Sequence, residues 1–159
     1  MNAPPGPLAT RRLILASVAL IGLGNLPFGS RPAHAANDKY PEDAFKQKSQ
    51  ADAIKSLYGR SAEPSDKIKL DAPEIAENGA VVPISVTTTL DKVTSISFLV
   101  AENPNALAAS YRIPEGTIPT VANRLKMAKT TNVLVIVEAD GKLFSATKEV
   151  KVTVGGCGG

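Results

Sequence analysis

The chain has 159 residues, enough for one domain, and its net charge of +3 comes from 18 basic and 15 acidic side chains. Arg11, Arg12 and Arg31 fall in an expected leader, so the remaining chain is neutral, and it shows no basic patch with interleaved aromatic residues of the kind that binds nucleic acid. His34, the only histidine, also falls there, and one methionine, Met127, remains. This composition excludes a Cys–His catalytic pair, a Cys/His metal cluster and a Met-rich copper site, so no metal or cofactor is expected.

Residues 1–35 have the pattern of an export signal peptide. Arg11-Arg12 precede an apolar stretch from Leu13 to Leu23, and Ala33-His34-Ala35 offers a small-residue cleavage site. About a dozen apolar residues are too few to span a bilayer, which takes about 20, so a membrane anchor is the weaker alternative. The arginine pair favours the twin-arginine route, with Ile14 where that motif prefers phenylalanine. We therefore expect export to the periplasm.

Residues 36–66 are expected to form an N-terminal helix and a linker. The helix is predicted from Tyr40 to Tyr58, because Pro41 suits its first turn and Gly59 can end it. Its apolar residues form one narrow face, which can pack on its own domain or on a second subunit, and we favour its own domain. The linker is polar and contains Pro64.

From residue 67 onward the apolar residues recur with a period of two, which predicts β-strands. Strands are expected near residues 68–70, 81–90, 93–101, 108–113, 119–128, 132–138 and 142–154. Pro83 suggests a strand edge or bulge, and the doubly apolar run Val133–Val137 predicts a central strand. Asn78-Gly79 marks a turn and Asp140-Gly141 a hairpin. The pattern predicts an all-β fold, an immunoglobulin-like antiparallel β-sandwich over residues 67–154.

The chain ends in Gly155-Gly156-Cys157-Gly158-Gly159, directly after the last predicted strand. Glycine restricts the backbone least, and five residues can extend roughly 16 Å, so residues 155–159 are expected to be a flexible arm. Such an arm can deliver the thiol of Cys157 into another protein's active site. An incidental cysteine at a frayed chain end is the alternative. No base or cation adjoins Cys157 in the sequence, so partner enzymes would have to activate its thiol.

Essentially the whole chain after the expected leader closely resembles the SoxY family, the sulfur-carrying subunits of periplasmic SoxYZ complexes, and the resemblance is strongest in three stretches. They are residues 103–109, 120–128 and 139–159, and the glycine-flanked cysteine after the last strand is the most specific of these features. Ala106 stands where the family often has proline, and Asn123 where threonine or a similar residue is expected. The resemblance implies that Cys157 holds sulfur intermediates of thiosulfate oxidation covalently, as S-thiosulfonate and persulfide-type adducts, while the chain itself is not an enzyme.

The resemblance also implies a set of partners. SoxZ is expected as the tight heterodimer subunit, exported together with this chain. SoxAX would couple thiosulfate oxidatively to the thiol, SoxB would release sulfate, and SoxCD, where present, would oxidise the remaining sulfur. No nucleic-acid or membrane partner is expected. Four basic residues could attract acidic partner surfaces, although a solvated basic face is the simpler interpretation: Arg112, Arg124, Lys126 and Lys129.

Three other roles for Cys157 stay open. A disulfide to another molecule would make the chain a structural or interaction module. Lipid attachment fits poorly, since prenylation needs the cysteine fourth from the end and only two residues follow Cys157. A thiol enzyme would lack its histidine. The covalent carrier is therefore the favoured hypothesis.

Overall fold

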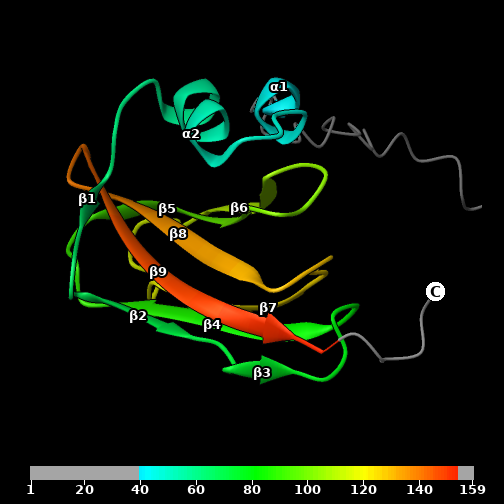
Figure 1. Ribbon diagram of the computed structural model, residues 1–159. Helices are drawn as coiled ribbons and strands as arrows, with labels where there is room; N and C mark the ends of the chain where they lie inside the picture. Colours follow the sequence, from blue (N-terminus) through cyan, green and yellow to red (C-terminus); the bar gives the residue numbers. More distant parts are fainter. Residues whose placement is uncertain (1–39, 154–159) are drawn as a thin grey trace, which may run out of the picture. The chain divides into compact units, whose positions relative to one another are not determined.

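The computed structural model describes residues 40–153, which Figure 1 shows as a ribbon. The predicted export signal, residues 1–35, and the predicted arm, residues 155–159, lie outside the described residues. Within the described range, two helices precede nine strands, in this order: α1 (Glu42–Phe45), α2 (Gln50–Tyr58), β1 (Glu63–Pro64), β2 (Ile68–Asp71), β3 (Ile75–Ala76), β4 (Val82–Thr88), β5 (Val93–Val100), β6 (Leu107–Arg112), β7 (Thr120–Leu125), β8 (Thr131–Ala139) and β9 (Lys142–Val152).

The prediction of one helix from Tyr40 to Tyr58 is wrong, because the chain forms two short helices there. Ser49 interrupts the helix with an extended backbone (φ −104°, ψ 147°), and its side chain accepts a hydrogen bond from the backbone N–H of Asp52 at 3.0 Å. This is the geometry of a helix N-cap, which starts α2. Gly59 ends α2 in the left-handed conformation, as expected, and its N–H donates to the carbonyl of Lys55 at 2.8 Å.

The strands form two sheets that pack face to face. The larger sheet has the order β1-β9-β8-β5-β6, with β3 also paired to β9, and the smaller sheet has the order β2-β4-β7. In the lettering used for immunoglobulin domains, β2-β4-β7 correspond to strands A-B-E, and β9-β8-β5-β6 correspond to strands G-F-C-C′. The arrangement is therefore of the immunoglobulin type. The predicted all-β sandwich is therefore confirmed.

Two short strands depart from the predicted antiparallel sandwich. Glu63 and Pro64 of β1 pair with β9 in parallel, and so do Ile75 and Ala76 of β3. β1 also lies within the predicted linker, so the sheet begins before residue 67. Each of these strands has only two residues, too few to show a period in the sequence.

β8 shows that both faces of the larger sheet are covered. Val133, Val135 and Val137 belong to the apolar cluster between the two sheets. Leu134 and Ile136 point the other way, into a second cluster beneath the helices. β8 lies between β5 and β9, so the prediction of a central strand is confirmed. The result is three layers, with the helices, the larger sheet and the smaller sheet stacked in that order (Figure 1).

The helices pack on their own domain. Ala44 of α1 and Ala53 of α2 are fully buried against the larger sheet, in contact with the cluster that contains Leu99 and Ile136. Small side chains at these positions let the helices lie close to the strands. The narrow apolar face inferred from the sequence is thus occupied within the chain.

Two predicted turn and edge features take the expected form. Asp140 and Gly141 both have positive φ, 47° and 72°, which matches the tight hairpin turn that joins β8 to β9. Pro83 pairs with Arg124 on β7, while β2 reaches β4 only from Ser85 onward. Pro83 therefore has a neighbouring strand on one side only, which agrees with the edge position expected for a proline in a strand.

Candidate functional site

The predicted site residues, Cys157 and the glycines Gly155, Gly156, Gly158 and Gly159, lie outside the described residues. The last described residue is Thr153, one position after the end of β9. The structure therefore describes the point from which the C-terminal tail departs. Three segments meet there, residues 74–79, 126–130 and 151–153, and we call them together the tail exit.

Hydrogen bonds hold β9 on both sides up to its last residue. On one side β8 pairs with it as far as Thr131 opposite Val150, and the N–H of Val152 then donates to the Oγ1 of Thr130 at 2.9 Å. On the other side, the N–H of Lys151 donates to the carbonyl of Glu74 at 2.9 Å. The strand is therefore fixed where the tail begins.

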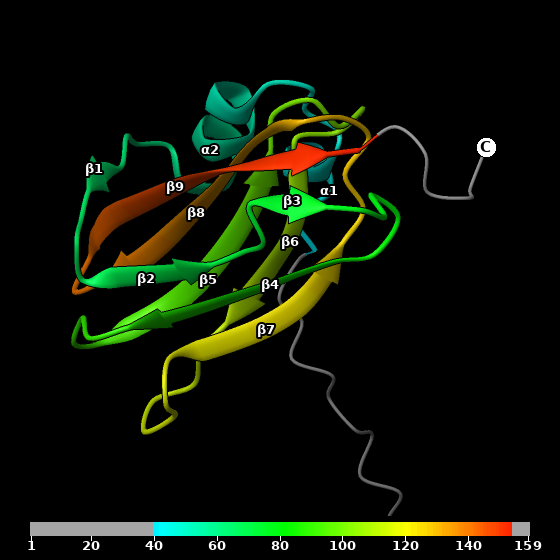
Figure 2. The same cartoon turned by 60° about the horizontal axis from the view of Figure 1, so that its bottom comes forward.

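β3 extends this support to Thr153. The two residues of β3 pair in parallel with Lys151 and Val152, and the N–H of Thr153 donates to the carbonyl of Ala76 at 3.1 Å. Lys148 adds a bond from its Nζ to the carbonyl of Ala72, at 2.6 Å, just before β3. Figure 2 shows β3 beside the end of β9.

Gly79 lets two backbone segments meet at the tail exit. Its carbonyl accepts a hydrogen bond from the N–H of Met127 at 2.7 Å. A Cβ atom at Gly79 would lie 2.6 Å from the carbonyl oxygen of Met127 and 2.8 Å from Cγ1 of Val152, both closer than such atoms pack. A residue without a side chain is therefore required there.

Asn103 fastens the segment that carries Met127. Its Nδ2 donates to the carbonyl of Lys126 at 2.7 Å, and its Oδ1 accepts from the N–H of Ala128 at 3.0 Å. Two of the stretches that resemble SoxY, residues 103–109 and 120–128, thus meet in space. Sequence reasoning singled out both stretches but gave no reason to place them together beside the tail.

The two departures from the family pattern lie elsewhere. The N–H of Ala106 donates to the carbonyl of Gln47 at 2.8 Å, a bond that a proline there could not make. Asn123 donates from Nδ2 to the hydroxyl of Tyr111 at 3.4 Å, which joins the edges of the two sheets. Neither residue belongs to the segments that hold β9.

A polar cluster beneath α2 was not foreseen. The hydroxyl of Tyr58 lies 2.7 Å from the Oγ of Ser97 and 3.1 Å from the Oγ of Ser95. Ser95 donates to Glu138 at 3.2 Å, and Arg60 forms an ion pair with the same carboxylate. Burial raises the pKa of Tyr58 above its ordinary value, against a smaller lowering by the two serine hydroxyls. The alternation of Ser95 and Ser97 with apolar neighbours was the one sequence signal for such a polar layer.

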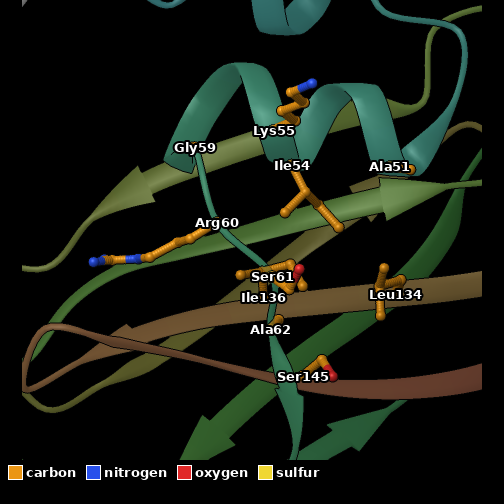
Figure 3. A pocket seen from close by; sticks show the side chains of 10 residues that line it. All are labelled: Ala51, Ile54, Lys55, Gly59, Arg60, Ser61, Ala62, Leu134, Ile136 and Ser145. Atoms are coloured by element: carbon orange, nitrogen blue, oxygen red, sulfur yellow. The ribbon is translucent and has the colours of Figure 1, made fainter.

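A groove of about 480 Å³ lies beside α2, and Figure 3 shows the side chains that line it. Leu134 and Ile136 of β8 form its floor, and Ile54 of α2 points into it. Ser145 of β9 also lines it and precedes Val152 by seven residues, about 23 Å along an extended strand. The groove is therefore not at the tail exit.

Charges of both signs surround the tail exit. Of the basic residues named from the sequence, Arg124, Lys126 and Lys129 are exposed, and none of them forms an ion pair within residues 40–153. Glu74 and Glu77, which flank β3 in the sequence, are also exposed. No set of three or more His, Cys, Asp or Glu side chains in the described part of the chain could hold a metal ion. Nor does any helix between residues 40 and 153 have the length and apolar character to cross a membrane.

Comparisons with known proteins agree on one family. Residues 54–157 match the family model described as sulfur oxidation protein SoxY. The chain is similar to the solved sulfur carrier protein SoxY from Chlorobium limicola f thiosulfatophilum, with 43% identity and a TM-score of 0.60, over 65% of this chain and 96% of that chain. A more distant similarity is to superoxide reductase (neelaredoxin) from Ignicoccus hospitalis, with 21% identity and a TM-score of 0.48, over 55% of this chain and 80% of that one. No curated protein matches the chain. Because the matched region is more than half of its length, the chain belongs to the SoxY family of sulfur oxidation proteins.

Proposed function

We propose that this chain is a covalent sulfur carrier in thiosulfate oxidation and that Cys157 is the attachment point. The observation that supports the site most directly is the extent of the family match, which runs to residue 157. The tail exit supports it further, because a fixed strand end is what a short carrier arm needs as its base. The chain acts as a carrier, and its partner enzymes perform the chemical steps.

The proposed cycle begins with loading of the thiol. Thiosulfate joins the sulfur of Cys157 through a new S–S bond, the thiol proton is released, and two electrons pass to the cytochrome SoxAX. SoxB then adds water across the terminal S–S bond, which releases sulfate and leaves a persulfide on Cys157. Where SoxCD is present, it oxidises that outer sulfur, and a second hydrolysis by SoxB restores the thiol. This chain contributes the thiol and its position.

The short tail limits how far the thiol can travel. Cys157 lies four positions after Thr153, the last residue held by β3, and four extended residues span at most about 14 Å. The adduct can enter a channel of that depth and no deeper. We therefore infer that each partner enzyme must approach the chain closely.

A tight heterodimer with SoxZ is part of the proposal. Among the described residues, β6 pairs only with β5, and β7 pairs only with β4, so both strands have one free edge. β6 has neither proline nor lysine, two of the features that keep free edges from pairing with other chains. A covering subunit would protect these edges. The proposal includes a periplasmic location, reached by the twin-arginine route, on the basis of the export signal predicted from the sequence of residues 1–35.

The test is the intact mass of the mature protein from cells grown on thiosulfate, measured without reductant beside a Cys157→Ser variant. We expect a reducible mass addition of thiosulfate or sulfane sulfur that is absent from the variant. An unmodified thiol, or only a disulfide-linked dimer, would contradict the carrier role and favour a structural module. Co-purification of SoxZ with both proteins would test the heterodimer separately.

A further inference from the structure

We propose that the surface around the tail exit, including Ile75 and the adjoining Val81, is the docking site for the enzymes that process the sulfur on Cys157. The partner would be the rim of an active-site channel that offers apolar side chains. This inference rests on the proposed carrier function, and it adds the surface that the partner enzymes contact.

The first argument is the reach of the tail. Thr153 is held to Ala76, and about 14 Å of extended chain is the most that separates it from Cys157. Each residue that enters a channel uses about 3.3 Å of this length. An enzyme that takes Cys157 into an enclosed site must therefore place the mouth of its channel against the residues that flank Thr153.

The second argument is that the base of the tail cannot easily lengthen. Freeing one more residue of β9 requires the loss of the bond from Val152 to Thr130 and of the pairing with β3. Freeing a further residue breaks the bond from Lys151 to Glu74 as well. A partner therefore gains more by approaching the tail exit than by pulling out more chain.

The third argument is what the surface offers there. Five large apolar side chains are exposed among the described residues: Tyr40, Ile75, Val81, Tyr111 and Ile118. Ile75, 59% exposed, pairs with Lys151 on β9, and Val81, 50% exposed, lies two residues from Gly79, which packs on Val152. Ile75 thus adjoins the last residues of β9, and Val81 follows closely in the chain after Gly79, which also adjoins them.

The charged residues at the tail exit do not favour a partner of either net charge. Glu74 and Glu77 lie in the same segment as Ile75, while Lys129 and Lys151 are exposed in the other two segments of the tail exit. A mixture of charges gives no strong net field, so recognition would depend on the apolar contacts. Side chains at the desolvated centre of an interface contribute more to binding than those at its rim, and a charge placed there would be buried without a partner.

The test uses the complex of the mature chain with SoxZ, loaded chemically. The thiolate of Cys157 attacks a central sulfur of tetrathionate, one S–S bond breaks, thiosulfate leaves, and the S-thiosulfonate forms without any other oxidant. Release of sulfate by the cognate SoxB is then measured for the unaltered carrier and for Ile75→Asp and Val81→Asp. Ile118→Asp is the matched control, because Ile118 is 77% exposed and precedes β7 at the end away from Met127.

We expect kcat/KM of SoxB to fall about tenfold for each variant at the tail exit and to stay unchanged for Ile118→Asp. The rate of loading by tetrathionate should be equal in all four carriers, because a small reagent needs no docking surface. Ile75→Ser, a milder change, should give a smaller loss in the same direction.

Equal kcat/KM for the tail-exit variants and the control would overturn the docking site while leaving the carrier function intact. Loss of SoxZ from the Ile75 and Val81 variants would also overturn it, since the surface would then belong to the heterodimer. If the unaltered, loaded carrier releases no sulfate with SoxB, the proposed carrier function itself fails.

Discussion

Replacement of Gly79 by alanine is the sharpest test of how the tail exit is built. The added methyl carbon would lie 2.6 Å from the carbonyl oxygen of Met127 and 2.8 Å from Cγ1 of Val152. Overpacking of this kind costs about 1–3 kcal/mol, and separation of the two segments also weakens the bond between Met127 and Gly79, worth about 1 kcal/mol. The expected loss is about 3 kcal/mol. With an unfolding entropy of about 2.1 cal/mol/K per residue over roughly 120 residues, Tm should fall by about 12 °C.

The assay is thermal unfolding of the mature chain, with Ala80→Ser as the control in the same turn, because Ala80 is exposed. A second variant, Gly79→Ala with Val152→Ala, removes one of the two close contacts and leaves the carbonyl of Met127 in place. It should therefore recover only part of the lost stability. A Tm for Gly79→Ala within about 2 °C of the unaltered chain would refute the close approach described for this glycine.

Three further changes test other contacts. Tyr58→Phe removes a buried hydroxyl and should cost about 1–2 kcal/mol at neutral pH. Because the pKa of Tyr58 is raised by burial above 10.0, the unaltered chain should lose stability as pH rises above 10, and alkaline unfolding curves of the variant should show a shallower loss. Asn103→Ala breaks two backbone contacts and should lower the free energy of unfolding in urea by about 1–2 kcal/mol, whereas the exposed Asn105→Ala should change it little. Thr130→Val removes the acceptor for the N–H of Val152, so exchange of that amide hydrogen should become faster, while Thr130→Ser should restore protection.

The long strands of the sandwich could be predicted from the sequence because the pattern of apolar residues in each one shows which of its faces are buried. Val133–Val137 is apolar at every position, and both of its faces are buried. Asp140-Gly141 also fixes its hairpin locally, because few other residue pairs tolerate positive φ twice in succession. Such features need no knowledge of distant residues.

The parts that could not be predicted depend on contacts between distant segments. β1 and β3 have two residues each, and only their pairing with β9 makes them strands. The break at Ser49 was missed, because Pro41 and Gly59 at the two ends suggested one continuous helix. For the site, the sequence predicted Cys157 and its glycines, which lie outside the described residues, whereas the contacts of Asn103 and Gly79 with the segment around Met127 became visible only in three dimensions.

The parallel pairing of β3 with β9 has a mechanical consequence. Under the proposed function, a partner that draws the tail into its channel would pull on Thr153 along the axis of β9. The hydrogen bonds to β3 and β8 run across that axis, so the pull loads them together in shear rather than opening them one after another. The end of β9 should therefore resist this pull, and the tail would start from the same fixed point in every encounter.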